Sequence, residues 1–380
     1  MSEYQYYEFQ TADRRLSEKE MQDLRSYSTR AVITPASFCN EYSFGDFKGN
    51  PSAWMEKYFD GFVYLANWGT HEFQLALPAK LLSAETARLY CSGDAASVRE
   101  KSGKVILTFL SEEESGGEWV EGGGVLSSLL PLRKELAQGD LRGLYVGWLL
   151  NVQAGGLEEE DAEPPLPPNL GGLSGSLSDL VDFLRIDPDL LAVATEASPR
   201  KQTRPAQPAE IAVWVAQIPV REKDDLLVRL MAGEDDALGA ELRSRFDRSR
   251  ADSGPAPEVP RRTVGQLLAA AEAFRSKRQH AEAHRAAEQK ARQEHLAATA
   301  RQKHLDALTG RESELWTQVD QLAATKLPKC YDLAVQHLVD LRDIAARKGE
   351  EADFSRRLAI LREVQSRKPS FIGRLRDKGL

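Results

Sequence analysis

"GFVYLANWGTHEFQLAL", residues 61–77, decides the fold class of the first part of the chain. Residues 62–66 form an apolar run of strand length, and residues 67–70 have the composition of a tight turn. After the turn, large apolar side chains occupy every second position from Phe73 to Leu77, as in a strand with one buried face. The stretch therefore predicts a β-hairpin.

The residues before this hairpin predict more strands and helices. Residues 4–10, YQYYEFQ, are aromatic-rich and typical of a strand. Ser17 and Glu20 form a capping box that begins a helix. Residues 31–34 predict a short strand, and residues 51–60 a helix that begins at a proline.

The residues after the hairpin complete the first predicted domain. A helix is expected at 83–90, a strand at 104–110, and two helices at about 124–138 and 140–154. Residues 1–154 are therefore predicted to form one α+β domain, a mostly antiparallel sheet with helices on one side.

The middle of the chain changes in composition. Residues 155–175, GGLEEEDAEPPLPPNLGGLSG, are rich in glycine, proline and acidic residues, which predicts a linker or an irregular wrapping segment. Residues 176–252 predict a small helical region, in which Asp187 and Pro188 open one helix. Residues 253–262 form a second linker.

Residues 263–309 predict one long helix, about 68 Å in length at about 1.5 Å per residue. Large apolar side chains and leucine heptads are missing from about 276–294, so an exposed, semi-rigid helix is expected there. Residues 310–380 predict a tail of helical hairpins that follows the long helix. Its helices are expected at about 311–325, 329–347 and 350–366.

The charge is unevenly distributed along the chain. The net charge of −8 is the sum of about +8 in residues 261–380 and about −16 in residues 1–260. Such a split indicates two surfaces with different partners, or attraction between different parts of two copies. Hydrophobic residues make up 42% of the chain, which is enough for a globular core.

The cysteines and the first residues indicate a cytoplasmic protein. Cys39, Cys91 and Cys330 are far apart and form no CxxC pair, which argues against a disulfide framework and a structural zinc site. The first ten residues do not resemble a secretory signal, and no run of about 18 apolar residues indicates a membrane span. We therefore expect the reducing cytoplasm and no membrane.

The histidines of the long helix are the strongest candidate for a metal site. His280, His284 and Glu288 share one helix face, a spacing that zinc can use. The HExxH motif, however, needs Glu at position 281, which is Ala281 here, and the surrounding stretch is polar on every face. The glycine clusters and the acidic residues 158–161 also lack phosphate-loop and calcium-loop patterns, so no cofactor and no metal are expected.

Catalytic residues are equally hard to assemble from the sequence. No nucleophile with a histidine base is apparent, and His71, a lone histidine on the hairpin beside Glu72, is expected at the surface. An enzyme site would instead use polar residues around the aromatic cluster, of which the candidates are Glu41, Asp46, Lys48 and Asp60.

The aromatic residues of 42–73 are expected to divide into two groups. Those on helix or strand faces are expected in a core: Phe59, Phe62, Tyr64 and Phe73. Those in loops are expected to face a partner, because loops carry recognition and aromatic anchors dominate interfaces. This partner-binding set is Phe44, Asp46, Phe47, Lys48 and Trp68. The alternative is that the loop folds over the sheet and plugs its open face.

A basic set near the end of the chain would attract nucleic acid. Its members are Arg367, Lys368, Arg374, Arg376 and Lys378. Acidic residues interleave with them and no DNA- or RNA-reading motif is present, so a charged or protein-docking surface is the favoured interpretation.

Two resemblances extend these observations. The segments YQYYEFQTADRRLSEKEM, FGDFKGNP and YFDGFVYLANWGT resemble a family of uncharacterised bacterial proteins. The tail that begins YDLAVQHLVDLRDIAARKGEEADF is similar to helical tails at the end of some bacterial SWIM zinc-finger proteins and to degenerate tetratricopeptide hairpins. The zinc ligands of a SWIM domain are absent from this chain, so the resemblance implies a helical tail and no zinc-dependent activity.

The sequence therefore predicts a non-enzymatic protein-interaction adaptor or scaffold of the bacterial cytoplasm, with an unidentified protein partner. The second hypothesis is a nucleic-acid-associated accessory protein of a prokaryotic defence system, which rests on the basic tail. The third is a hydrolase or another enzyme that uses the aromatic cluster as its pocket.

Overall fold

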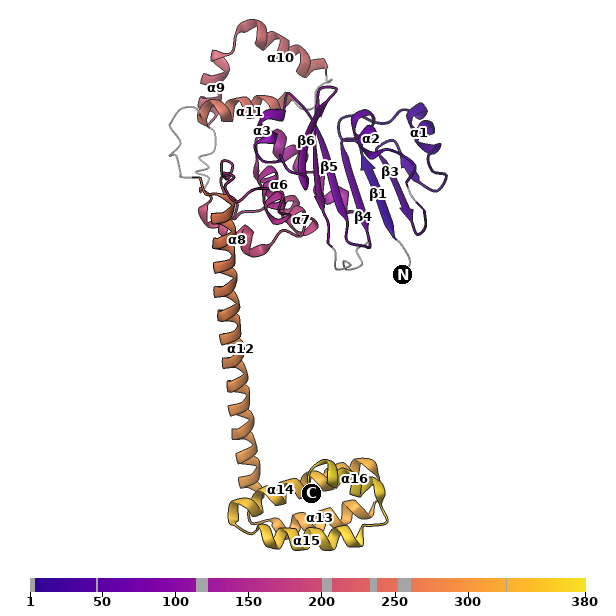
Figure 1. The fold of residues 1–380 in the computed structure, drawn as a ribbon, viewed down its shortest axis with the longest axis vertical. Helices are drawn as coiled ribbons and strands as arrows, with labels where there is room; N and C mark the ends of the chain where they lie inside the picture. The colour runs from indigo at the N-terminus through magenta and orange to yellow at the C-terminus, as the bar shows by residue number, and fades with distance from the viewer. Residues whose placement is uncertain are drawn as a thin grey trace. The chain divides into compact units, whose positions relative to one another are not determined.

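The computed structural model describes residues 4–45, 47–113, 122–199, 207–232, 238–251, 261–325 and 327–380. They divide into two compact units, Met1–Lys277 (unit 1) and Arg278–Leu380 (unit 2). Unit 1 contains an antiparallel sheet with helices, and unit 2 is helical (Figure 1). The predicted fold class, a sheet with helices followed by helical regions and a long helix, is confirmed.

The sheet of unit 1 has seven antiparallel strands in the order β2-β3-β1-β4-β5-β7-β6. The strands are β1 (Gln5–Gln10), β2 (Val32–Thr34), β3 (Ser37–Tyr42), β4 (Gly61–Ala66), β5 (His71–Pro78), β6 (Ala96–Lys101) and β7 (Lys104–Ser111). The predicted hairpin is β4–β5, with Val63 opposite Phe73. Gly69 has a φ of 100° in its turn, a conformation that glycine adopts at little cost.

The sequence-based prediction missed β3 and β6. The prediction ended the strand at residue 34, but the chain turns at Pro35 and Ala36 and pairs back on β2. β6 and β7 are joined by Ser102 and Gly103, whose φ angles of 52° and 75° fit a two-residue hairpin turn. The Ser-Gly pair before the strongly apolar β7 is the local signal that indicates β6.

The helices of unit 1 follow the predicted positions with one division. The predicted helix at 124–138 is two helices, because Pro131 interrupts the backbone hydrogen bonding between Leu129 and Leu132. The capping box of Ser17 and Glu20 is present. The helices are α1 (Glu18–Arg25), α2 (Pro51–Lys57), α3 (Ala84–Arg88), α4 (Val125–Leu129), α5 (Leu132–Ala137), α6 (Arg142–Gln153), α7 (Gly175–Phe183), α8 (Pro188–Ala197), α9 (Pro208–Gln217), α10 (Val220–Ala232) and α11 (Leu238–Ala251).

Both faces of the sheet carry a hydrophobic core, so the prediction of helices on one side was wrong. One face packs against α3 to α8. Of these helices, α3, α6, α7 and α8 are labelled beside the sheet in Figure 1. The other face holds a second core, here called the aromatic core, which α1 and α2 cover. Its fully buried aromatic side chains are Phe9, Phe38, Phe59 and Phe62. Alternation along β1 supplies both cores, because Tyr6 points to the first and Phe9 to the second.

Residues 155–175, predicted as a linker or a wrapping segment, pack within unit 1. Glu163 is buried, and its carboxylate accepts two hydrogen bonds from Arg262, at 2.8 and 2.7 Å, and one from the Tyr145 hydroxyl at 2.5 Å. Ala162 pairs with Thr263 in an isolated antiparallel bridge. The segment therefore wraps against the start of the long helix instead of separating two domains.

The predicted long helix is α12 (Val264–Leu308). Its first apolar residues, Val264, Leu267 and Ala271, belong to the core of unit 1. Every side chain from 276 to 298 is exposed, which confirms the exposed stretch predicted at 276–294. Of the predicted linker at 253–262, residues 253–260 lie outside the described part of the chain.

The helices of unit 2 pack around one core. They are α13 (Glu312–Ala324), α14 (Pro328–Lys348), α15 (Glu351–Val364) and α16 (Pro369–Asp377), of which α16 was not predicted. Leu338, Phe354 and Phe371 are buried in this core. No helix in the described part of the chain combines the length and the apolar character needed to cross a membrane.

A buried carboxylate joins the end of α12 to α14 within unit 2. Asp340 of α14 is buried and binds Arg301, and its Oδ2 lies 3.0 Å from Nε2 of His304. Burial alone would raise the pKa of Asp340, but the hydrogen bonds from His304 and Arg301 outweigh it and hold the pKa below its usual value. Asp340 is therefore an ionised anchor for the last turns of α12.

We expect Phe62→Ala to lower the free energy of unfolding by about 3 to 5 kcal/mol, because it empties a fully buried site. The Phe62 ring stacks on Phe9 with centroids 4.4 Å apart, so the aromatic core loses its central contact. Urea denaturation followed by tryptophan fluorescence measures the change. A loss below about 1 kcal/mol would contradict the assignment of Phe62 to a close-packed core.

We expect Asp340→Ala to lower the free energy of unfolding by about 1.5 to 3 kcal/mol at pH 7, because charged hydrogen bonds are lost. The folded-state pKa lies below that of an unfolded aspartate, about 3.9. The contribution is therefore complete above this value and lost as the pH falls through the folded-state pKa. Hydrogen exchange of α14 at pH 7 and in acid tests this, with Asp320→Ala, at an exposed site, as the control. A difference between Asp340→Ala and the wild type that persists unchanged in acid would contradict the proposed pKa.

Candidate functional site

The predicted partner-binding residues in the loop after β3 lie in two different environments, some packed and some exposed. Phe47 packs into the aromatic core, stacked on Tyr7 with ring centroids 4.7 Å apart and in an edge contact with Trp54 at 4.9 Å. Phe44 is 81% exposed, and Lys48 is also exposed. The plug alternative therefore holds for Phe47, which covers the sheet, while Phe44 remains at the surface.

Phe44 and Trp68 belong to two loops that are tied to the first residue of β1 and to the residue before it. The Gln5 side chain donates to the carbonyl of Gly45 at 3.2 Å. Asn67 accepts a hydrogen bond from the Tyr4 N–H at 3.1 Å, and Trp68, which follows it, is 44% exposed. These bonds place both exposed aromatic residues at the same end of the sheet. We call this region the loop end. Asp46, the remaining member of the predicted partner-binding set, lies outside the described part of the chain.

A row of tyrosines crosses the sheet next to the loop end. Tyr42, Tyr7 and Tyr64 lie on neighbouring strands, with ring centroids 5.7 Å apart for the first pair and 4.6 Å for the second. The hydroxyls of Tyr7 and Tyr64 both donate to Oε1 of the buried Gln5, at 2.8 and 3.2 Å. These three half-buried rings and Gln5 are called the tyrosine row. They connect the aromatic core to the surface.

Polar side chains continue this sheet face beyond the tyrosine row. Glu72 lies opposite Tyr64, and its carboxylate accepts a hydrogen bond from Gln74 at 2.6 Å. Gln74 in turn accepts a hydrogen bond from Arg99 at 3.2 Å. Burial raises the pKa of Glu72, which favours its neutral form. The face can therefore bind by hydrogen bonding and aromatic contact.

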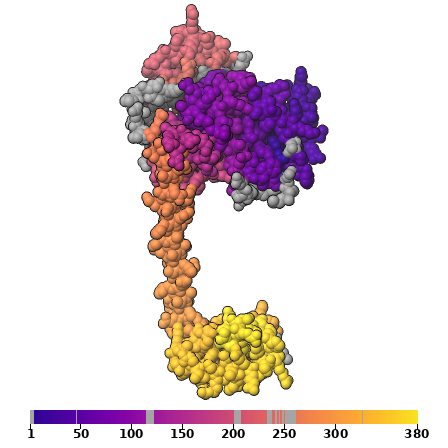
Figure 2. Space-filling model, viewed as in Figure 1, coloured from indigo at the N-terminus to yellow at the C-terminus, as the bar shows by residue number. Residues whose placement is uncertain are grey.

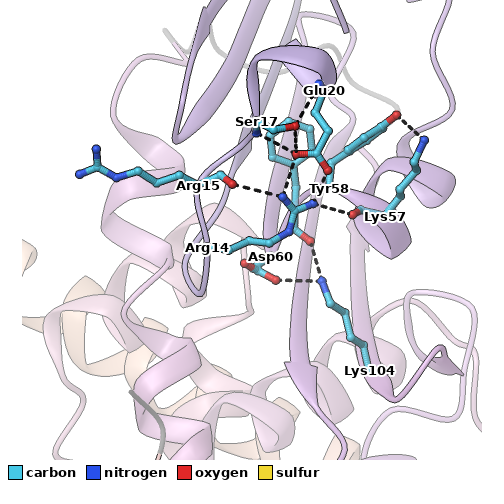
Figure 3. A network of polar contacts seen from close by, with 9 residues as sticks. Arg14, Arg15, Ser17, Glu20, Lys57, Tyr58, Asp60 and Lys104 are labelled. Carbon is cyan, nitrogen blue, oxygen red and sulfur yellow. Dashed lines mark hydrogen bonds and ion pairs between the residues drawn. The ribbon is translucent and has the colours of Figure 1, made fainter. Parts of the chain in front are cut away.

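Asp60, a candidate for an enzyme site, is occupied by structural bonds (Figure 3). Its Oδ2 accepts from the backbone N–H groups of Ala12 and Asp13 at 2.8 and 3.2 Å, and its Oδ1 accepts from Lys104 at 3.0 Å. Burial would raise the pKa of Asp60, but these donors outweigh it and the pKa is lowered. Asp60 therefore holds the loop between β1 and α1 as an ionised carboxylate.

Arg14 strengthens the same loop, as Figure 3 shows. Its guanidinium donates two hydrogen bonds to the carboxylate of Glu20, at 2.9 and 2.8 Å, and one to the carbonyl of Lys57 at 3.1 Å. The bond with Arg14 lowers the pKa of Glu20 to about 2, with help from the Ser17 N–H. Among the predicted enzyme-site residues, Glu41 is exposed at the edge of the sheet.

His71 is buried, so the expectation of a surface histidine was wrong. Its Nδ1 lies 2.8 Å from the carbonyl oxygen of Phe183, and the two rings stack with centroids 5.0 Å apart. Burial lowers the pKa of His71, which favours the neutral ring. The side chain joins β5 to α7 on the sheet face opposite the tyrosine row.

The other predicted sites are surface features. His280, His284 and Glu288 are exposed on α12, and Nδ1 of His284 lies 3.6 Å from Glu288. Among the described residues, no group of three or more His, Cys, Asp or Glu side chains lies close enough to hold a metal ion.

The basic set near the end of the chain is partly used inside unit 2. Lys368 donates to the carbonyl of Ala323 at 2.7 Å, and Arg374 binds the carboxylate of Asp332 at 2.6 Å. The remaining members of the set are exposed: Arg367, Arg376 and Lys378. The structure thus leaves three of the five predicted cations facing solvent.

Sequence reasoning missed the tyrosine row as a unit. Tyr7 and Tyr64 were assigned to separate strands, and Tyr42 had no predicted strand at all because β3 was missed. The alternating pattern of SFCNEY, with Phe38, Asn40 and Tyr42 on one face, was the available signal.

Comparison with known proteins gives no match: no family model, no curated protein and no solved structure matches the chain. The resemblances drawn from the sequence stay predictions.

Proposed function

We propose that the protein is a non-enzymatic interaction adaptor whose unit 1 binds a partner protein at the loop end. The observation that carries this proposal is the exposure of Phe44 and Trp68 beside a well-packed aromatic core. The chain has covered Phe47 in the same loop and left Phe44 in solvent, although burial of such a ring is worth about 1.5 to 3 kcal/mol. A partner surface would recover that free energy.

The rigidity of the surroundings supports the same function. Gln5 fixes the loop that carries Phe44, and the turn that carries Trp68 is held to Tyr4. A partner would therefore meet two anchors whose backbones are already ordered, so the entropy lost on binding is small. Asp60 and His71 of unit 1 serve structural bonds, which favours binding over catalysis at these two residues.

The charge of unit 1 indicates the chemistry of this partner. Residues 1–277 carry a formal charge of about −13. A partner segment with apolar side chains for Phe44 and Trp68 and with basic residues around them fits this surface best.

We expect the double variant Phe44→Ala and Trp68→Ala to lose its partner and to keep its melting temperature. Two aromatic anchors are worth about 2 kcal/mol or more at an interface, so affinity should fall at least about 30-fold. Quantitative affinity capture from native cells, with the captured protein then titrated in purified form, measures the loss.

Two single variants control this experiment. Leu89→Ala removes an exposed apolar side chain elsewhere in unit 1 and should change neither binding nor melting. Phe47→Ala should instead destabilise unit 1 by about 2 to 3 kcal/mol, because its ring is packed in the aromatic core. Undiminished binding by the double variant would refute the loop end as the interface.

The nucleic-acid hypothesis has its own test in the exposed cations of unit 2. If Arg367, Arg376 and Lys378 contact phosphates, the binding of a DNA or RNA duplex should weaken steeply between about 50 and 200 mM salt. The triple change of these residues to Gln should reduce the dependence on salt. Absence of binding at low salt would exclude this second function.

A further inference from the structure

α7 ends with an arginine in a backbone conformation that usually belongs to glycine. Arg185 has a φ of 54°, in the left-handed region. The N–H of Arg185 donates to the carbonyl of Asp182 at 3.1 Å, and the N–H of Ile186 donates to that of Val181 at 3.0 Å. These two bonds form a Schellman motif, in which the position of Arg185 favours glycine because a side chain crowds the backbone there.

Two other helices of unit 1 end in the same motif with glycine. Gly139 after α5 and Gly155 after α6 have φ angles of 83° and 69°, and each takes part in the same pattern of hydrogen bonds. Arg185 is therefore strained at a place where the chain elsewhere uses glycine. A strained residue persists only where its surroundings hold it, so the contacts of Arg185 carry the explanation.

The side chain of Arg185 reaches the turn that carries Trp68. Its Nη1 donates to the carbonyl oxygen of Gly69 at 2.9 Å, and its Nε lies 3.6 Å from Oε2 of Glu113. The turn also packs closely on the backbone after β7, because a side chain at Gly69 would collide with the carbonyl oxygen of Glu113. The half-buried guanidinium thus joins α7, the turn between β4 and β5, and the end of β7.

The backbone of Arg185 is itself held in place. The amide of Gln153 in α6 donates to the carbonyl of Arg185 at 2.9 Å and accepts from the N–H of Asp187 at 2.7 Å. The contact of His71 with the carbonyl of Phe183 fixes the same end of α7 to the first residue of β5. Figure 1 shows α7 beside β5, and Figure 2 shows in the same view that the magenta surface of the helices adjoins the purple surface of the strands.

We propose that Arg185 is a positioning residue of the loop end, whose side chain fixes the turn that carries Trp68 in the conformation that a partner binds. Gly69, which Arg185 contacts, directly follows Trp68 in the chain. A turn that is ordered in advance loses less entropy when a partner binds, so Arg185 raises the affinity through Trp68. This inference rests on the proposed function at the loop end.

Two substitutions separate the side chain of Arg185 from its backbone strain. Arg185→Gly removes both, whereas Arg185→Ala removes the contacts and keeps a side chain at a positive φ. Arg185→Gly should therefore melt at a higher temperature than Arg185→Ala. Ser102→Gly is the matched control, because Ser102 has a φ of 52° in an exposed turn, and it should melt at or above the wild type. An Arg185→Ala variant that melts as high as Arg185→Gly would contradict the strain at this position.

Hydrogen exchange of the Gly69 amide, followed by NMR in the full chain, measures the order of the turn. This N–H donates to the carbonyl of Ala66 at 3.0 Å within the turn. Both Arg185 variants should exchange the proton at least about fivefold faster than the wild type, because the turn loses a charged hydrogen bond. Ser102→Gly should exchange it at the wild-type rate. An unchanged rate in both Arg185 variants would overturn the proposal.

A double-mutant cycle with Trp68 distinguishes positioning from a general effect on stability. The probe is the purified protein that the wild type captures and that the Phe44→Ala and Trp68→Ala double variant loses. Arg185→Gly should weaken binding of this protein about three- to tenfold, and the same change in a Trp68→Ala background should weaken it less than about twofold. Ser102→Gly should bind like the wild type. An equal loss in both backgrounds, or no loss in either, would show that Arg185 does not act through Trp68.

Failure of the proposed function has a different signature. If the Phe44→Ala and Trp68→Ala double variant binds like the wild type, the loop end is not the interface, and the positioning role of Arg185 falls with it. If the double variant loses binding while Arg185→Gly retains it, the loop end stands as the interface and the role of Arg185 alone is refuted.

Discussion

The position of β1 between β3 and β4 is the constraint on which the rest of unit 1 depends. Its six residues pair in antiparallel register on both sides, so the first strand of the chain joins two hairpins that would otherwise be separate. Because side chains alternate along a strand, β1 also supplies both cores, with Tyr6 on one face and Phe9 on the other. The tyrosine row and both loops of the loop end take their positions from this strand.

Buried carboxylates hold the irregular parts of the chain to its regular parts. Asp60 fixes the loop between β1 and α1, Glu163 fixes the wrapping segment to the start of α12, and Asp340 fixes the end of α12 to α14. Each has a cationic partner, because an unpaired buried charge costs several kcal/mol. The acidic residues of the chain therefore serve both its internal joints and its surface charge.

The surfaces with functional interest are those where packing has left large apolar side chains in solvent. At the loop end Phe44 and Trp68 are exposed, whereas Phe47 of the same loop as Phe44 packs against the aromatic core. The inner face of α10 packs with α9 and α11 in a small hydrophobic core, whereas apolar side chains on its outer face are exposed. In both places the exposed apolar side chains lie on an ordered backbone. A partner that binds an ordered backbone loses less conformational entropy, so the free energy of binding is more favourable.

The sequence by itself determined the local structure of this protein. Periodicity, capping residues and turn residues depend on neighbours within a few positions, and they were sufficient for the β4–β5 hairpin, the capping box of α1, and the extent and exposure of α12. The division of the aromatic residues was also partly predictable, because Phe59, Phe62 and Phe73 lie on patterned faces and are fully buried.

Only the tertiary structure decided which distant segments meet. Phe44 and Phe47 share one loop and one chemistry, yet Phe47 packs on Tyr7 while Phe44 is exposed, because Gln5 holds the loop between them at Gly45. The pairing of residues 162 and 263 across the supposed linker likewise depends on a partner about 100 residues away. Such contacts form only when the chain folds and brings distant segments together, and no local pattern in a single sequence predicts them.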